Sequence, residues 1–206
     1  AQPSESEPYY LYPQAVCQPQ TALVLIHLEQ IRLLRALLNY CPYLAAPQPD
    51  LKSINWLHYN HQTLNQRIEA FITQMMDHAP LKEVLEASLN LQNRSQILKS
   101  LDEHFFEIAY QQLPEELPTA LSDFRTNLNE GLHTILLTLI EALEQGDPMD
   151  LTFVQQMTGN KSSLSALIHS KILKAHPNLS HKEQELLFTL TGRFERLSWL
   201  LGQLGK

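Results

Sequence analysis

The chain of 206 residues suits one domain of ordinary size, and its hydrophobic fraction of 44% supports a core and excludes a disordered chain. Its formal net charge of -7 and the lack of any basic run argue against a nucleic-acid-binding or anionic-membrane surface. Only 6 glycines are present, which disfavours an all-β fold with many tight turns.

The first 18 residues are rich in proline and glutamine and predict an irregular segment. They have neither the basic start nor the apolar core of a signal peptide. From Pro19, apolar residues recur at spacings of three and four, which predicts a helix. This helix should end near Pro42, because proline disfavours helical geometry in the residue before it. Asp50 can cap a second helix, whose apolar stripe continues to Met75.

Prolines and a glycine mark the next helix boundaries. Pro80 opens a third helix that ends before Pro114, and Pro118 opens a fourth, since proline suits the first turn. Gly146 stops the fourth helix, and Pro148 opens the fifth directly after a capping aspartate.

The fifth helix is expected to run to about Ala175, with a kink or break in the sequence TGNKSS at residues 158–163, which forms helix poorly. Ser180 followed three residues later by Glu183 is a capping-box pattern and opens a sixth helix. No strand pattern stands out. The sequence therefore predicts an all-α fold of six helices, in which short connections make consecutive helices antiparallel.

The longest apolar run, LHTILLTLIEAL, has 12 residues and contains Glu141, so it is shorter than the ~18–20 residues of a membrane span. We therefore expect no direct membrane insertion. The two cysteines, Cys17 and Cys41, lack zinc-ligand spacing and lie near apolar helical positions. We interpret both as reduced thiols in the core, which fits a reducing compartment.

Four stretches carry a resemblance to a known family. They are PYYLYPQAVCQPQTALVLIHLEQIRLL at 8–34, NLQNRSQI at 90–97, LIEALEQGDPMDLTFV at 139–154 and LTGRFERLSWLL at 190–201. In this order they resemble the start, the first acidic NLERIGD-like motif, the AL…GD turn and the second acidic motif of the PhoU-like domain that follows the membrane region of bacterial sodium/phosphate cotransporter proteins. The resemblance extends over nearly the whole chain.

The resemblance implies a six-helix PhoU-like bundle made of two three-helix repeats. The irregular segment 1–18 would precede a domain at 19–206, with a first half at 19–113 and a second half at 118–206. The implied function is that of a non-enzymatic regulatory domain at the cytoplasmic face of the bacterial inner membrane. It would be joined to the transmembrane transporter domain of the same polypeptide and would modulate phosphate transport. The lack of an initial methionine is typical of a fragment of a longer protein.

Two alternative functions stay open. Stand-alone members of the PhoU family restrain phosphate uptake, and some bind metal, so the chain could be a stand-alone metal-binding regulator. It could also be a helical protein-interaction adaptor. A surplus apolar face would then be covered by a partner or by a second copy in a homodimer, whereas the sequence equally allows a self-contained core.

The acidic motifs of the family place a Glu and an Asp four residues apart on one helical face, where they can bind metal clusters. Carried onto this sequence, the first motif gives Gln92 and Gln96, and the second gives Glu195 and Trp199. Neutral amides are poor ligands for such clusters. We therefore expect no metal or other cofactor, and retain Gln92, Gln96 and Glu195 as motif-equivalent binding positions on a polar face.

Arg94 lies within the apolar stripe of the third helix. A buried arginine needs a partner, so Arg94 either forms an internal ion pair or extends its head group to solvent. The alternative is contact with an anion such as phosphate at the domain core. We retain Arg94 as a fourth candidate binding residue.

Catalytic patterns are weak. Glu130 and His133 form an ExxH motif, but the second ExxH of a di-iron bundle is missing. His58 and His61 could share a metal, although spacing indicates no third ligand. Neither a Cys–His nucleophile pair nor a glycine-rich phosphate loop is recognisable. We expect a protein that is not an enzyme.

Overall fold

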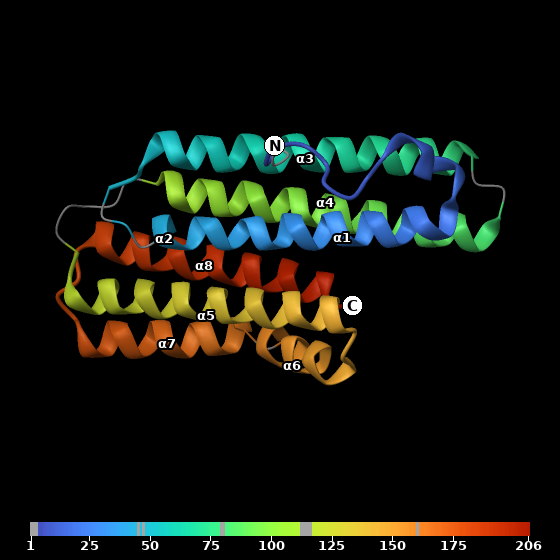
Figure 1. The fold of residues 1–206 in the computed structure, drawn as a ribbon. Coiled ribbons are helices and arrows are strands. Elements are labelled where there is room, and N and C mark those ends of the chain that lie inside the picture. The colour runs from blue at the N-terminus through green and yellow to red at the C-terminus, as the bar shows by residue number, and fades with distance from the viewer. Residues whose placement is uncertain (1–3, 45, 47, 79–80, 112–116, 160) are drawn as a thin grey trace. The chain divides into compact units, whose positions relative to one another are not determined.

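The computed structural model describes residues 4–206 except 45, 47, 79–80, 112–116 and 160, and for 161–165 and 168 it describes the backbone alone. All regular elements of the described residues are helical, which confirms the predicted all-α class (Figure 1). The elements are η1 (Pro13–Cys17), α1 (Pro19–Leu37), η2 (Leu38–Tyr40), α2 (Cys41–Leu44), α3 (Leu51–His78), α4 (Lys82–Tyr110), α5 (Thr119–Gln145), α6 (Pro148–Gly159), α7 (Lys161–Ala175) and α8 (His181–Leu204).

The predicted helix ends are set by local chemistry. Gly146 adopts the left-handed conformation (φ 65°) that closes α5, and its N–H donates to Ala142 O at 2.8 Å. The capping box predicted at Ser180 and Glu183 is present at the start of α8. The break expected in the fifth helix lies between α6 and α7.

The first helix differs from the prediction. It ends at Leu37, not at Pro42, and a 3₁₀ turn and the short helix α2 follow. Pro42 is the second residue of α2. Proline is tolerated there because the first-turn N–H groups have no partner within a helix. The proline thus lies inside a new helix and does not end the old one.

The chain divides into two compact units. Unit 1 comprises Ala1–Tyr40 and Leu51–Phe106, and unit 2 comprises Cys41–Asp50 and Glu107–Lys206. Unit 1 therefore contains α1, α3 and most of α4, which run side by side (Figure 1). Unit 2 contains α2, the end of α4 and α5 to α8. The predicted assignment of two repeats at 19–113 and 118–206 remains a prediction.

Unit 1 has an aliphatic core between its three long helices. Its buried side chains come from apolar positions at helical spacing on each helix. They include Ile26, Leu33, Leu34 and Leu37 of α1, Ile54, Leu64, Ile68, Ile72 and Met75 of α3, and Val84, Leu98, Leu101 and Phe105 of α4. At one end, the rings of Tyr40 and Phe105 stack with centroids 5.9 Å apart.

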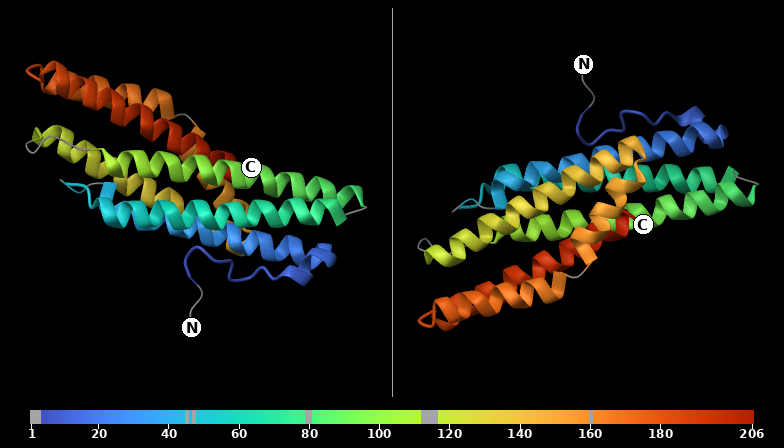
Figure 2. Two further views of the ribbon diagram at one scale, coloured as in Figure 1. Left: turned by 90° about the horizontal axis from the view of Figure 1, so that it is seen from above. Right: turned by 90° about the horizontal axis from the view of Figure 1, so that it is seen from below.

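The N-terminal segment lies along α1 and is fastened to it by a buried acid (Figure 2). Glu29 is fully buried, and its Oε1 accepts hydrogen bonds from the backbone N–H groups of Tyr10 and Leu11. Arg32 donates to Glu29 Oε2 at 3.3 Å and to the carbonyl of Glu7 at 2.7 Å. Apart from η1, the described part of the predicted irregular segment forms no helix or strand.

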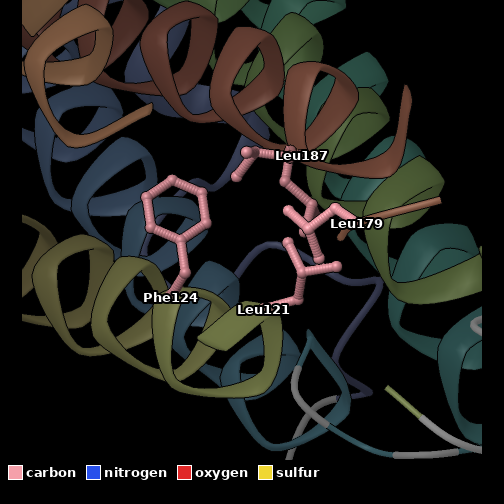
Figure 3. Close-up of a cluster of buried hydrophobic side chains, with 5 residues drawn as sticks. Leu121, Phe124, Leu179 and Leu187 are labelled. Atoms are coloured by element: carbon pink, nitrogen blue, oxygen red, sulfur yellow. The ribbon is translucent and has the colours of Figure 1, made fainter. Parts of the chain in front are cut away.

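Unit 2 has its own hydrophobic cluster. Leu121 and Phe124 of α5 meet Leu187 and Leu190 of α8, and Leu179 packs against them from the turn before α8 (Figure 3). Elsewhere in this unit, α6 contacts both α5 and α8, and α7 packs on α8. The end of α8 passes close to α6 at a glycine.

That glycine supports a prediction. A Cβ at Gly202 would lie 2.6 Å from Thr158 Oγ1 and 3.2 Å from Thr158 Cβ. Gly202→Ala should therefore force α6 and α8 apart and lower the free energy of unfolding by about 1–3 kcal/mol, as overpacking does. Urea unfolding followed by circular dichroism measures the loss. Thr158→Ala removes the nearest opposing atom, Oγ1, and leaves Cβ, so the double variant should recover part of the loss. Equal losses with and without Thr158→Ala would contradict this packing.

The cysteines divide between core and surface. Cys41 is buried, as predicted, and burial raises the pKa of its thiol to about 11, so the thiol stays protonated. Cys17 is exposed at the end of η1, so its assignment to the core is wrong. The helical pattern of α1 does not extend back to Cys17.

Among the described helices, none has the length and apolarity that crossing a membrane requires.

Candidate functional site: a buried polar cluster in unit 1

The most unusual side chain of unit 1 is Asp102. It lies on the buried face of α4, four residues after Leu98 and three before Phe105, and it is fully buried. A lone buried carboxylate is costly unless donors surround it. The position of Asp102 in an apolar stripe therefore requires polar partners from neighbouring elements.

Three donors satisfy Asp102. The Tyr40 hydroxyl donates to Oδ1 at 2.7 Å, and Gln62 Nε2 donates to Oδ2 at 2.7 Å. His58 Nδ1 lies 2.6 Å from Oδ2. His58 and Gln62 are four residues apart on α3 and so share one helical face, while Tyr40 ends η2. The cluster joins three elements of unit 1 at a single carboxylate.

His61 approaches the same carboxylate differently. Its Nδ1 lies 3.7 Å from Asp102 Oδ1 and has no hydrogen-bond partner. Its Nε2 is 3.2 Å from the carbonyl oxygen of Leu33. Because a carbonyl only accepts, Nε2 must carry the hydrogen. His61 is thereby held in one tautomer at the α1–α3 contact.

Burial and the Asp102 charge have opposite effects on the pKa values of the two histidines but act in the same direction on Tyr40. Burial and the adjacent carboxylate raise the pKa of Tyr40 well above its usual range, so its hydroxyl remains a donor. The hydrogen bond to Asp102 raises the pKa of His58 above 6.5 despite partial burial, with a smaller contribution from the charge of Glu103. Burial lowers the pKa of His61, although Asp102 opposes this shift.

These pKa shifts predict that the free energy of unfolding passes through a maximum as pH changes. The pKa of His58 is higher in the fold than in the unfolded chain. Its stabilising contribution is therefore complete below pH 6.5 and is lost as pH rises through the folded-state pKa. His61 has the opposite sign: its contribution is present above pH 6.5 and is lost as pH falls.

Urea unfolding from about pH 6 to about pH 8.5 tests the His58 contribution. We expect the free energy of unfolding to fall across this range in the wild-type protein. His58→Gln, which can still donate to Asp102, should flatten the fall. His133→Gln replaces an exposed histidine of α5 and should leave the profile unchanged. Parallel profiles for wild type and His58→Gln would contradict the assignment.

A second polar layer crosses the middle of unit 1. Gln30 Nε2 of α1 donates to Leu91 O at 2.7 Å and to Ser95 Oγ at 3.0 Å. Asn65 Nδ2 of α3 donates to Ser95 O at 2.9 Å. Gln30, Asn65 and Ser95 are all buried. Within residues 90–97 of α4, which carry several side-chain amides, Ser95 is thus the side chain that is buried in the core.

Two of the motif-equivalent residues, Gln92 and Gln96, lie on α4 next to this layer. Gln92 is half-buried, and Gln96 is exposed and donates to Glu69 Oε1 of α3 at 2.8 Å. Glu195 is half-buried on α8, in unit 2, where Arg196 lies over the ring of Trp199. The candidate positions of the first motif therefore belong to unit 1, and that of the second belongs to unit 2.

Arg94 has an uncharged partner. Its Nη1 lies 2.9 Å from His27 Nδ1 of α1. A guanidinium group can only donate, so this nitrogen of His27 must accept and cannot carry a proton. Burial lowers the pKa of Arg94. The residue forms an internal hydrogen bond between α1 and α4 of the type that fixes helix orientation.

Metal and catalytic alternatives have little geometric support. In the part of the chain that the structure describes, no three His, Cys, Asp or Glu side chains form a group suited to a metal ion. The shared partner of His58 and His61 is Asp102, and its hydrogen bond occupies Nδ1 of His58. Glu130 and His133 are exposed on α5.

The cluster includes residues that sequence reasoning missed. Asp102, Tyr40 and Gln62 were not recognised as site residues. A signal for Asp102 was present, because it falls in register with Leu98 and Phe105 on the apolar face of the helix. An acid in such a register indicates a buried carboxylate with partners elsewhere. The identity of those partners cannot be read from the spacing.

No protein-family model, no curated protein and no solved structure matches this chain. The family resemblance of the four sequence stretches therefore remains a prediction, and arguments about function depend on the residues of the chain itself.

Proposed function

We propose that the chain is a non-enzymatic regulatory domain of PhoU type that modulates phosphate transport. It would be joined to the transmembrane domain of a sodium/phosphate cotransporter-type protein and act at the cytoplasmic face of the bacterial inner membrane. The observation that carries the proposal is the division into two compact helical units, with three long helices in unit 1. The resemblance likewise implies two helical halves, and the three long helices of unit 1 support its first half.

The use of polar side chains supports a mechanical role. Asp102, Ser95 and Glu29 are fully buried, and each binds groups from neighbouring segments. These contacts fix how the helices of unit 1 and the N-terminal segment pack. A regulatory domain of this kind would act by shifting between two packings, each favouring a different state of the transporter.

Phosphate uptake by cells tests the proposal. Cells would express either the complete reading frame that contains this chain or the same frame lacking residues 19–206. We expect the deletion to change the initial rate of radiolabelled phosphate uptake at least threefold at equal membrane abundance. Asp102→Asn should shift the rate in the same direction, and Glu86→Gln, which neutralises an exposed acid of the same helix, should not. An unchanged rate in the deletion strain would reject phosphate regulation.

The reading frame upstream of Ala1 gives an independent test. We expect it to encode hydrophobic membrane spans in the same frame. A start codon close to Ala1 with no such spans would reject the attachment to a transporter, and would favour a stand-alone regulator.

A helical interaction adaptor is the second candidate. It is favoured by two aromatic side chains of α3, Trp56 and Tyr59, which are 55% and 64% exposed. Large exposed aromatic side chains are enriched at protein–protein interfaces. An adaptor would leave phosphate uptake unchanged on deletion, so the uptake experiment separates the two candidates.

A further inference from the structure

Unit 2 contains a small cavity with an unusual lining. Its volume is about 30 Å³, and side chains of α5 and α8 form most of its wall. The wall is mainly apolar, with Leu128, Leu190 and Phe194 among its residues. Two polar side chains, Arg125 and Asn129, face the same space from successive turns of α5.

Two donor atoms of Arg125 have no acceptor among the described residues. Its Nε and Nη1 are buried and form no hydrogen bond to any residue that the structure describes. Burial lowers the pKa of Arg125, but an arginine remains charged at neutral pH. Two buried donors on a cation beside apolar side chains create a strong demand for an anionic acceptor.

Asn129 has the opposite requirement, because its carbonyl oxygen needs a hydrogen-bond donor. Its Nδ2 donates to the carbonyl oxygen of Cys41 at 3.2 Å, which fixes the orientation of the amide. Its Oδ1 is buried and accepts no hydrogen bond from the described residues. A ligand that satisfies all of these atoms must therefore accept hydrogen bonds from Arg125 and donate one to Asn129.

These demands define a chemical class. Chloride and carboxylates accept hydrogen bonds but donate none. Water does both but carries no charge. A small oxyanion with a hydroxyl group, such as bicarbonate or hydrogen phosphate, accepts, donates and balances the guanidinium charge. The volume of about 30 Å³ is two to three times the ~10–15 Å³ that one ordered water needs, which suits an anion of a few heavy atoms.

We propose that the Arg125–Asn129 cavity of unit 2 is a binding site for a small hydroxylated oxyanion. The site is independent of the regulatory function proposed above, because it is inferred from unsatisfied polar atoms alone. Bicarbonate and hydrogen phosphate share the required chemistry, and the experiment distinguishes them.

Thermal unfolding of the whole chain at constant ionic strength tests the site. Sodium phosphate, sodium bicarbonate, sodium chloride and sodium formate would be compared at one pH. We expect phosphate or bicarbonate to raise Tm by about 5–10 °C at 100 times its Kd. Chloride and formate should bind with a Kd at least tenfold higher. The anion with the larger shift identifies the preferred ligand.

Two variants of the cavity and one control locate the effect. Arg125→Met removes the charge and should abolish the anion-dependent shift, while Lys182→Met, which removes an exposed charge of α8, should retain it. Asn129→Asp places a carboxylate one turn from Arg125, where it can take the role of the anion. This variant should weaken the apparent Kd at least tenfold, and it decides the question if Arg125→Met fails to fold.

Three results would overturn the proposal: no stabilisation of the wild-type protein by either oxyanion, equal stabilisation by chloride, or an undiminished shift in the variants that fold. Isothermal titration calorimetry of wild type and Asn129→Asp with the preferred oxyanion gives the Kd values directly.

Discussion

Asp102→Ala should lower the free energy of unfolding by about 3–5 kcal/mol, the largest effect that we expect from a single substitution in unit 1. The carboxylate is fully buried and accepts from Tyr40, Gln62 and His58. Alanine would leave these donors without an acceptor in a place that water reaches poorly. Urea unfolding followed by circular dichroism measures the total loss, and hydrogen exchange of α3 and α4 amides reports whether unit 1 carries it.

Matched variants separate charge from shape. Asp102→Asn keeps the size of the side chain but presents an NH₂ group to groups that donate, so it should lose much of the same stability. Glu86→Gln alters an exposed acid of the same helix and should change stability by no more than about 0.5 kcal/mol. A loss below about 1 kcal/mol for Asp102→Ala would show that Asp102 does not hold the cluster together.

Glu29→Ala should have the second-largest effect, about 2–3 kcal/mol, because a charged acceptor of several hydrogen bonds is removed from a buried position. The backbone N–H groups of Tyr10 and Leu11 would lose their side-chain acceptor, and Arg32 would lose its carboxylate partner. The N-terminal segment should then detach from α1. Limited proteolysis should cleave it at least tenfold faster than in the wild-type protein, with cleavage sites mapped by mass spectrometry.

Arg67→Gln is the matched control. Arg67 also binds the N-terminal segment, through Glu7, but both side chains of this ion pair are 45% exposed. Solvent screens such a pair, so its loss should cost less than about 1 kcal/mol and change cleavage little. Equal cleavage rates in Glu29→Ala and Arg67→Gln would mean that the buried acid does not hold the segment.

The helical class and several helix ends could be predicted because they depend on neighbouring residues. Gly146 stops α5 through its own backbone freedom, and Ser180 and Glu183 form a cap across four residues. The end of α1 could not be predicted in the same way. Pro42 is compatible with both the end of one helix and the first turn of another, and only packing decides between them.

The candidate site was less predictable because it depends on distant residues. His58 and His61 were recognised as neighbours on one helical face, but Asp102 lies 44 residues beyond His58 and Tyr40 lies 62 residues before Asp102. Helical spacing shows which side chains share a face and does not show which face lies opposite. The same limit applies to Ser95, whose burial among exposed amides depends on Gln30 of another helix.

The order in which the units occur along the chain constrains synthesis. Unit 1 ends at Phe106, so all of it emerges from the ribosome before most of unit 2, and it can fold on the nascent chain. Residues 41–50 emerge early but belong to the unit whose remaining residues begin at Glu107. Until translation supplies those residues, the apolar side chains of Cys41 and Leu44 await their burial partners, which makes this short stretch a natural target for a chaperone.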